Sequence, residues 1–245
     1  MTAFLADIRN TVAPDRRGPH GPLPPLLLSM TLVTGLVDAF SYLVLGHVFV
    51  ANMTGNIVLL GFALAGAPGF SITASVTALA SFFAGAFIGG RISTRYSGHR
   101  GRLHSSAATV QALFLGAAVI LAALSGSPVT SGFRYALIVA LGTAMGIQNA
   151  AARTIAVPDL TTTVLTLTIT GMAADSTLAG GPGSKAGRRL TAIATMLAGA
   201  LIGALLVRHS PIWYPLAIAL VTIAAGALAS HVLGKRDPAW VRVPA

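Results

Sequence analysis

The sequence predicts an all-α membrane protein with about six transmembrane helices and two re-entrant or broken segments. Three observations support this class. The mean hydropathy is +0.79 and only 9% of the 245 residues are charged, whereas a soluble domain carries about 25% charged residues. Long apolar runs recur along the chain, close to the roughly 20 residues that a helix needs to cross the hydrocarbon. Basic residues cluster between these runs, which is typical of topology signals.

The composition also narrows the function classes. The net charge of +10 does not indicate nucleic-acid binding, because the basic clusters lie between apolar segments and no RNA- or DNA-binding motif accompanies them. The chain contains no cysteine, which excludes disulfides, thiolate metal sites and thiol nucleophiles. None of the 6 histidines has the spacing of a metal site. We therefore expect no metal, no cofactor and no nucleic-acid partner.

Three regions are expected along the chain. Residues 1–23 contain Arg9, Arg16 and Arg17 and three prolines but no apolar run of the signal-peptide type, so they are interpreted as a disordered cytoplasmic arm rather than a cleaved signal. Residues 24–234 form one polytopic membrane domain. Residues 235–245 form a basic cytoplasmic tail.

Apolar segments follow one another through the membrane domain, at 24–46, 47–66, 70–90, 105–125, 132–152, 159–178, 190–208 and 212–234. Six of them are predicted to be ordinary spans. The second is unusual because it contains the polar run Asn52-Met53-Thr54-Gly55-Asn56 near its start. The sixth is unusual because it follows Pro158 and is rich in threonine.

The basic residues indicate how many segments cross. If all eight crossed with the N-terminus inside, ten of the 16 basic residues would lie inside the cell. If the second and sixth segments are re-entrant, 14 lie inside and only Arg134 and Arg208 lie outside. The positive-inside rule favours the second distribution. We expect six crossings with both termini cytoplasmic; eight crossings remain the alternative, because both unusual segments are long enough to span.

The two halves of the chain resemble each other. Residues 81–90 align with 195–204 with five of ten positions identical, and residues 35–39 align with 146–150. Halves 24–125 and 132–234 would each contain three crossings, so their orientations would be opposite, as in the inverted repeats of many transporters. The alternative is a chance alignment of Ala- and Gly-rich sequence.

Asp38 lies in the middle of the first segment, where a charge costs roughly 2.5–3.5 kcal/mol on insertion scales. Intramembrane carboxylates usually face a bundle interior or a watery cavity. Asp38 is therefore a candidate proton or cation acceptor, or an anchor for a polar solute. The alternative is a buried carboxylate that is hydrogen-bonded to Ser, Thr or Asn on a neighbouring helix.

The second segment offers Asn52, Thr54 and Asn56 as polar ligands, with Gly55 allowing the backbone to approach a solute. A half-helix beginning near Thr54 would also aim free N–H groups toward the membrane centre. The alternative is that Asn52 and Thr54 cap this helix.

The second half offers candidates for the opposite lip of the same polar centre, namely Gln148, Asn149, Asp159, Thr161 and Thr162. The alternatives are that Asp159 N-caps the helix of the sixth segment, that the threonines bond to carbonyls within it, and that the two amides join helices. The GxxxG pairs Gly85/Gly89 and Gly199/Gly203 are interpreted as helix-packing sites, either within the chain or in a homo-oligomer.

The run from Val48 to Asn56, together with Gly35 and Asp38, resembles the hallmark of the YoaK-like family, small bacterial membrane proteins grouped as a domain of unknown function. Residues 146–150 and Thr161-Thr162 resemble its second-half signature more loosely. The resemblance covers roughly residues 24–234 and implies six hydrophobic spans in the bacterial inner membrane. It implies no substrate, catalytic residue or cofactor. The two polar clusters differ in sequence, so the resemblance does not make them equivalent.

These features predict a small-solute transporter or channel with a polar site near the bilayer midplane. Its partners would be the lipid bilayer and a small solute, with proton coupling through Asp38. The alternative is a non-transporting scaffold, assembly factor or sensor that binds a partner within the bilayer. No enzymatic activity is expected, because GxGD and GxSxG motifs and metal constellations are missing.

Overall fold

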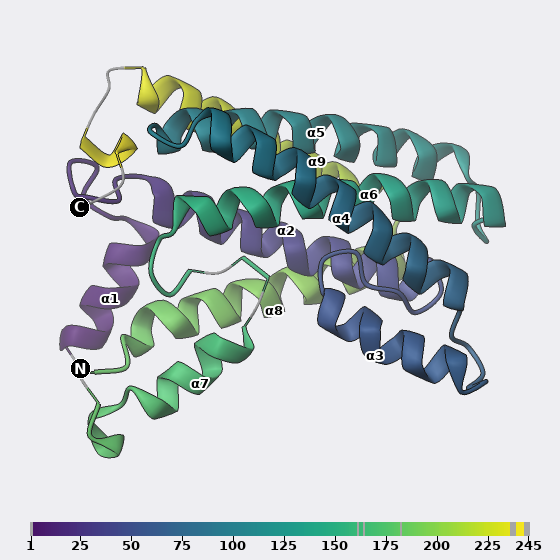
Figure 1. The fold of residues 1–245 in the computed structure, drawn as a ribbon, viewed down its shortest axis with the longest axis horizontal. Coiled ribbons are helices and arrows are strands. Elements are labelled where there is room, and N and C mark those ends of the chain that lie inside the picture. Colours follow the sequence, from purple (N-terminus) through teal and green to yellow (C-terminus); the bar gives the residue numbers. More distant parts are fainter. Residues whose placement is uncertain (1, 161, 164, 182, 236–238, 243–245) are drawn as a thin grey trace.

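The computed structural model describes residues 2–160, 162–163, 165–181, 183–235 and 239–242 (Figure 1). Every regular element in these ranges is a helix. The α-helices are α1 (Thr2–Val12), α2 (Leu23–Val44), α3 (Met53–Leu64), α4 (Ile72–Arg95), α5 (Arg100–Leu124), α6 (Ser131–Ile155), α7 (Thr166–Ala174), α8 (Ala186–His209) and α9 (Tyr214–Gly234). Short 3₁₀ turns follow at Thr177–Ala179 and Ala239–Val241.

Six helices are long and apolar enough to cross a membrane: α2, α4, α5, α6, α8 and α9, with 21 to 25 residues each. At 1.5 Å per residue, each is at least about 30 Å long, which matches the hydrocarbon thickness. Helix α3 has 12 residues and α7 has 9, so both are too short to cross. The predicted class, an all-α membrane protein with six spans and two shorter segments, is confirmed for the described residues.

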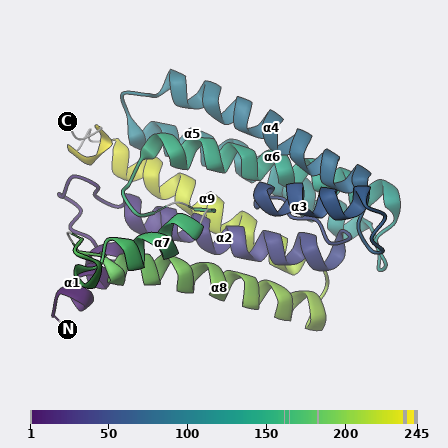
Figure 2. The same ribbon diagram turned by 60° about the horizontal axis from the view of Figure 1, so that its bottom comes forward.

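The bundle has two distinct ends. Helix α2 begins at Leu23 and α6 ends at Ile155 at the same end of the bundle, which we call the basic end. Helices α1 and α7 lie at the basic end, and α3 lies at the opposite end (Figures 1 and 2). Among the described basic residues, Arg134 and Arg208 alone belong to the opposite end, as the six-crossing prediction requires.

Helices α2 and α6 are the most buried spans. Helix α2 packs against α8 and α9, and α6 packs against α4 and α5. Large apolar side chains on the outer helices point away from the bundle, among them Phe83, Leu113, Leu197 and Val221. This outward apolar surface is what a lipid-facing bundle requires.

Helices α4 and α6 approach each other through glycine. A Cβ atom on Gly146 would lie only 2.1 Å from the carbonyl oxygen of Phe82, and one on Gly85 would lie 2.1 Å from that of Thr143. Gly89 lies one turn further along the same interface. The first GxxxG pair therefore packs within the chain.

Helices α2 and α8 form a second interface of the same kind. A Cβ atom on Gly35 would lie 2.3 Å from the carbonyl oxygen of Met196, and one on Gly199 would lie 2.2 Å from that of Leu32. Gly203 continues this interface. Small residues let helix backbones come this close in a membrane, where van der Waals packing drives association.

The structure differs from the disordered arm predicted for residues 1–23, because Thr2–Val12 form a helix that packs against α8. The buried Arg100 side chain also holds the arm, donating to the carbonyl oxygen of Pro19 (3.3 Å) and to Nδ1 of His20 (3.0 Å). Burial, and then the Arg100 charge, lowers the pKa of His20, which favours the neutral imidazole that can accept this hydrogen bond. The sequence pattern missed these contacts because they join distant segments.

Candidate functional site

Asp38 lies near the end of α2 and is 6% exposed. Its Oδ1 accepts hydrogen bonds from the backbone N–H groups of Val50 (3.1 Å) and Ala51 (2.9 Å). These partners are amides of the loop that leads into α3, not Ser, Thr or Asn side chains of a neighbouring helix. Asp38 therefore anchors residues 45–52 against the end of α2.

Asn56, in the first turn of α3, anchors the same loop. It accepts from the N–H of Phe49 (2.9 Å) and donates Nδ2–H to the carbonyl oxygen of Phe49 (2.6 Å). Asn52 caps α3, because its side-chain oxygen accepts from the N–H of Gly55 (3.2 Å). Thr54 is exposed. The first-half candidates thus gather at the opposite end of the bundle, where they shape the entry into α3.

A buried polar cluster lies in the middle of the bundle. Gln111 on α5 donates to Oε1 of Gln148 on α6 (2.7 Å), and Gln148 donates to Oγ1 of Thr34 on α2 (2.9 Å). All three side chains are fully buried, and Oε1 of Gln111 has no hydrogen-bond partner. Gln148 was predicted as a site residue, whereas Gln111 and Thr34 were not. An amide in the fourth apolar segment was the signal that could have identified Gln111.

Asp159 and the charges around it form an ion-pair cluster at the basic end. Arg189 donates Nε–H and Nη2–H to Oδ1 of Asp159 (3.0 and 2.7 Å) and also contacts Oδ2 of Asp175 (2.7 Å). Lys185 lies 3.7 Å from Oδ2 of Asp159. Helix α7 begins at Thr166, with Leu165 as its N-cap, so the prediction that Asp159 caps this helix is wrong. Its carboxylate is instead turned to α8.

Asn149 holds the segment before α7. Oγ1 of Thr163 donates to Oδ1 of Asn149, whose Nδ2 donates to the carbonyl oxygen of Met145 (3.0 Å). Thr162 is buried, and its Oγ1 has no hydrogen-bond partner. Thr161, another predicted site residue, lies outside the described residues.

A groove of about 940 Å³ runs between α4, α6 and the segment that follows α6, from which Ala156, Val157, Leu160, Thr162 and Thr163 line it, at the basic end. Along α4 its lining extends from Phe82 to Thr94, which is roughly 18 Å of helix and reaches the middle of the span. Asn149 and Thr162 line it, together with Ser93. The hydroxyl oxygens of Ser93 and Thr162 are buried and have no hydrogen-bond partner. Its size, and a lining that combines apolar side chains with hydroxyls, an amide and the side chain of Arg153, fit a small polar molecule.

The structure separates the candidates that the sequence placed in one polar centre. Asn149 and Thr162 share the groove, and Gln148 lies in the mid-bundle cluster. Asp159 belongs to the ion-pair cluster, and the first-half candidates Asp38, Asn52, Thr54, Gly55 and Asn56 lie toward the opposite end. The expectation of a single centre with two lips is thus replaced by a groove at one end and an anchored loop at the other.

Comparison with known proteins places this geometry in context. A family model described as "Protein of unknown function (DUF1275)" matches residues 26–230. The UPF0700 transmembrane protein YoaK of Bacillus subtilis (strain 168) is 37% identical over 156 residues, which cover 61% of this chain and 65% of that relative. The match thus spans slightly less than two thirds of the relative's length. No solved structure matches the chain.

Proposed function

The chain belongs to the DUF1275 family of membrane proteins of unknown function, and we propose that it moves a small polar solute across the bacterial cytoplasmic (inner) membrane as a transporter or channel. Membership confirms the resemblance predicted from the run Val48–Asn56. The function itself rests on the groove between α4, α6 and the segment that follows α6.

The unpaired hydroxyls in this groove are the observation that carries the proposal. Buried polar atoms in proteins almost always have a hydrogen-bond partner, so two unpaired ones lining a groove indicate room for a molecule that would bond to them. Ser93 and Thr162 leave two such atoms unpaired beside the amide of Asn149. A solute that carries hydroxyl, amide or carboxylate groups would satisfy them.

We propose that the two halves form an inverted repeat, which would support the transport proposal. The first long helix of each half packs against the third apolar segment of the other half, α2 against α8 and α6 against α4. The atoms that a Cβ on Gly146 would meet are the carbonyl oxygen of Phe82, the amide nitrogen of Ala86 and the carbonyl carbon of Gly85. The atoms that a Cβ on Gly35 would meet are those of Met196, Ala200 and Gly199, in the same order. The alignment predicted from sequence pairs these residues one to one. These matching atoms support the proposed repeat over the alternative of a chance alignment of Ala- and Gly-rich helices.

The two ends of this arrangement differ in a way that suits alternating access. The groove lies at the basic end, whereas the loop at the opposite end is held by Asp38 and Asn56. We assign the basic end to the cytoplasm from the positive-inside rule, so the conformation is open to the cytoplasm. Exchange of the two halves' conformations would close the groove and release residues 45–52, as in other inverted-repeat transporters.

Asp38 is the candidate for proton coupling. An ionised carboxylate accepts the hydrogen bonds of Val50 and Ala51 well, and protonation weakens it as an acceptor. Protonation of Asp38 would therefore favour release of the loop. We propose no enzymatic role. Three described carboxylates lie near the candidate clusters: Asp38 accepts hydrogen bonds from the loop before α3, and Asp159 and Asp175 are paired with Arg189.

A flux assay tests the proposal. Proteoliposomes with an imposed pH gradient are exposed to a mixture of isotope-labelled sugars, amino acids and carboxylic acids, and the lumen is analysed by mass spectrometry. Gly90 lines the groove, and a Cβ there would meet nothing within 4 Å, so Gly90→Trp should fill the groove without disturbing the helices. Ala84→Trp on the exposed face of α4 is the matched control.

We expect wild type and Ala84→Trp to accumulate at least one component above protein-free liposomes, and Gly90→Trp to lose most of that uptake. Equal uptake by Gly90→Trp and Ala84→Trp would show that the groove is not part of the solute pathway. If no component accumulates and a stoichiometric protein partner co-purifies from the membrane, the scaffold or sensor alternative replaces transport.

A further inference from the structure

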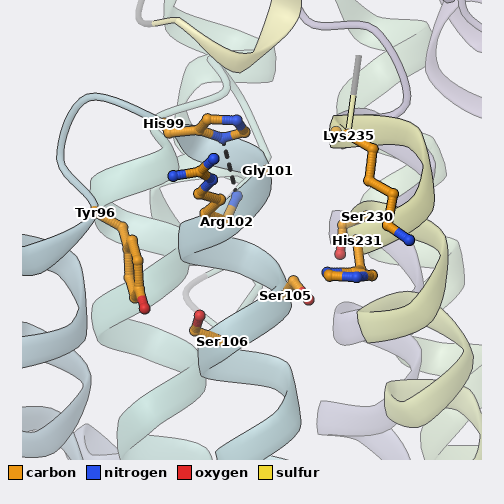
Figure 3. Close-up of a pocket in the computed structure, with 10 residues that line it drawn as sticks. Tyr96, His99, Gly101, Arg102, Ser105, Ser106, Ser230, His231 and Lys235 are labelled. Atoms are coloured by element: carbon orange, nitrogen blue, oxygen red, sulfur yellow. Dashed lines mark hydrogen bonds between the residues drawn. The ribbon is translucent and has the colours of Figure 1, made fainter. Parts of the chain in front are cut away.

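A second cavity, of about 420 Å³, lies at the basic end between the first turns of α5 and the last turns of α9 (Figure 3). Arg102 comes from α5, and His231 and Lys235 come from the end of α9 across the gap. The N–H of Arg102 is already satisfied by Nδ1 of His99 (3.1 Å). The cavity therefore draws its positive charge from side chains of two helices rather than from a helix terminus.

The lining of this cavity suits an anion with several oxygen atoms. Hydroxyl groups of Tyr96 and Ser106 add donors beside the basic side chains. No carboxylate among the described residues lines the cavity or pairs with Arg102 or Lys235. Arg and Lys side chains in this arrangement recognise phosphate groups.

A trough of about 340 Å³ continues from this cavity along the membrane-facing seam of α5 and α9. The two share Ser105 and His231 in their linings. Below these residues the trough is lined by Ala112, Ala224 and Leu228, and Leu228 is 64% exposed on the outer surface. A phosphate ion would occupy the basic cavity alone, whereas a mainly apolar trough that continues from it along the membrane-facing seam fits an acyl chain.

We propose that this site binds one anionic glycerophospholipid, with the phosphate between Arg102 and Lys235 and an acyl chain in the trough. The cytoplasmic leaflet supplies anionic lipid to basic side chains at this depth. A lipid held in this way would join the ends of α5 and α9, which pack against each other along their lengths. The site is separate from the groove between α4 and α6, so each can be tested without the other.

Native mass spectrometry of the full chain in detergent tests the proposal with dioleoyl phosphatidylglycerol as the probe. Arg102→Gln/Lys235→Gln removes the two charges of the cavity. Arg91→Gln is the control on α4, because Arg91 lies at the same end and lines a different pocket, and it is compared with Arg102→Gln alone so that both remove one charge. Arg95 is left unchanged, because its guanidinium lies 6.0 Å from the ring centroid of Tyr96 in the cavity. Ala224→Phe, at an exposed position, fills the trough without changing the charge.

We expect wild type to retain one phosphatidylglycerol per chain and to bind phosphatidylcholine at least tenfold more weakly. The cavity variant should weaken phosphatidylglycerol binding roughly tenfold, since each basic residue contributes several-fold; Ala224→Phe should also weaken it, and the α4 control should not. If the α4 control loses as much phosphatidylglycerol binding as the single cavity variant Arg102→Gln, general surface charge explains the binding and the proposed site is wrong. If Ala224→Phe binds phosphatidylglycerol as wild type does, and inorganic phosphate displaces the lipid, the cavity is a site for free phosphate and the lipid proposal is wrong.

Discussion

At the scale of single residues, the polar groups inside the bundle divide into anchors and unpaired groups. Asp38 and Asn149 occupy equivalent positions in the predicted repeat, and each binds the segment that precedes a short helix. Thr162 and Gln111 instead retain buried oxygens without a partner. The unpaired oxygens are therefore free to bond to a solute or to a trapped water.

Substitution of Asp38 separates its anchoring role from its proposed role in coupling. Asp38→Ala leaves two loop N–H groups without their acceptor, and each unsatisfied buried group costs about 1–3 kcal/mol, so the variant should melt well below wild type in detergent. Asp38→Asn keeps an acceptor oxygen in place and should melt close to wild type, while losing proton-driven uptake in proteoliposomes. Equal melting temperatures for wild type and Asp38→Ala would contradict the anchor.

The sequence identified Asp38 because a charge within an apolar run is conspicuous in one dimension. It did not identify the partners of Asp38, because Val50 and Ala51 reach the carboxylate only through the folded path of the loop. The ion pairs of Arg189 were missed for the same reason. Arg189 lies at the edge of an apolar segment, and its position in the sequence does not indicate which other segment its side chain will contact.

At the scale of elements, apolar length predicted the spans well and their ends less well. The first span was predicted at 24–46 and the helix is Leu23–Val44. Helix α5 begins at Arg100 rather than near residue 105, because a helix can continue past the apolar region when its polar side chains find partners. Among its described residues, the sixth segment, 159–178, contains the short helix Thr166–Ala174 and the start of a 3₁₀ turn at Thr177, whereas Asp159 and Thr163 before the helix contact Arg189 and Asn149.

The glycine interfaces give a prediction at this scale. Gly146→Ala and Gly35→Ala each place a Cβ atom within 2.3 Å of a backbone oxygen on the facing helix. The helices must separate, so each variant should lose about 1–3 kcal/mol of stability through overpacking. Gly61→Ala, where a Cβ meets nothing within 4 Å, is the control. Similar losses at both interface positions, measured by thermal unfolding in detergent, would support the repeat, and a loss at only one would argue against it.

At the scale of the whole molecule, charge and topology agree. The six spans place α1 and the described part of the C-terminal segment at the basic end, so the side preference inferred from Arg and Lys is consistent with the fold. The sequence did not predict the open groove at one end or the anchored loop at the other. They depend on how α3 and α7 pack against the spans, which no local sequence pattern specifies.

Labelling of single cysteines from each side of the membrane tests the central claim, a water-filled path from the cytoplasm to the middle of the bundle. Phe82 lines the groove, whereas the neighbouring Phe83 is 75% exposed on the outer surface. The two positions lie at the same depth of α4, and the chain has no native cysteine to confuse the readout. Ser97→Cys and Gly69→Cys mark the basic end and the opposite end.

With a membrane-impermeant maleimide on inside-out vesicles, we expect Phe82→Cys to label together with Ser97→Cys. Phe83→Cys should label from neither side, and Gly69→Cys should label only from the outside of intact cells. Protection of Phe82→Cys from both sides, or labelling of Phe82→Cys and Phe83→Cys to the same extent, would contradict a solute path along α4 and α6.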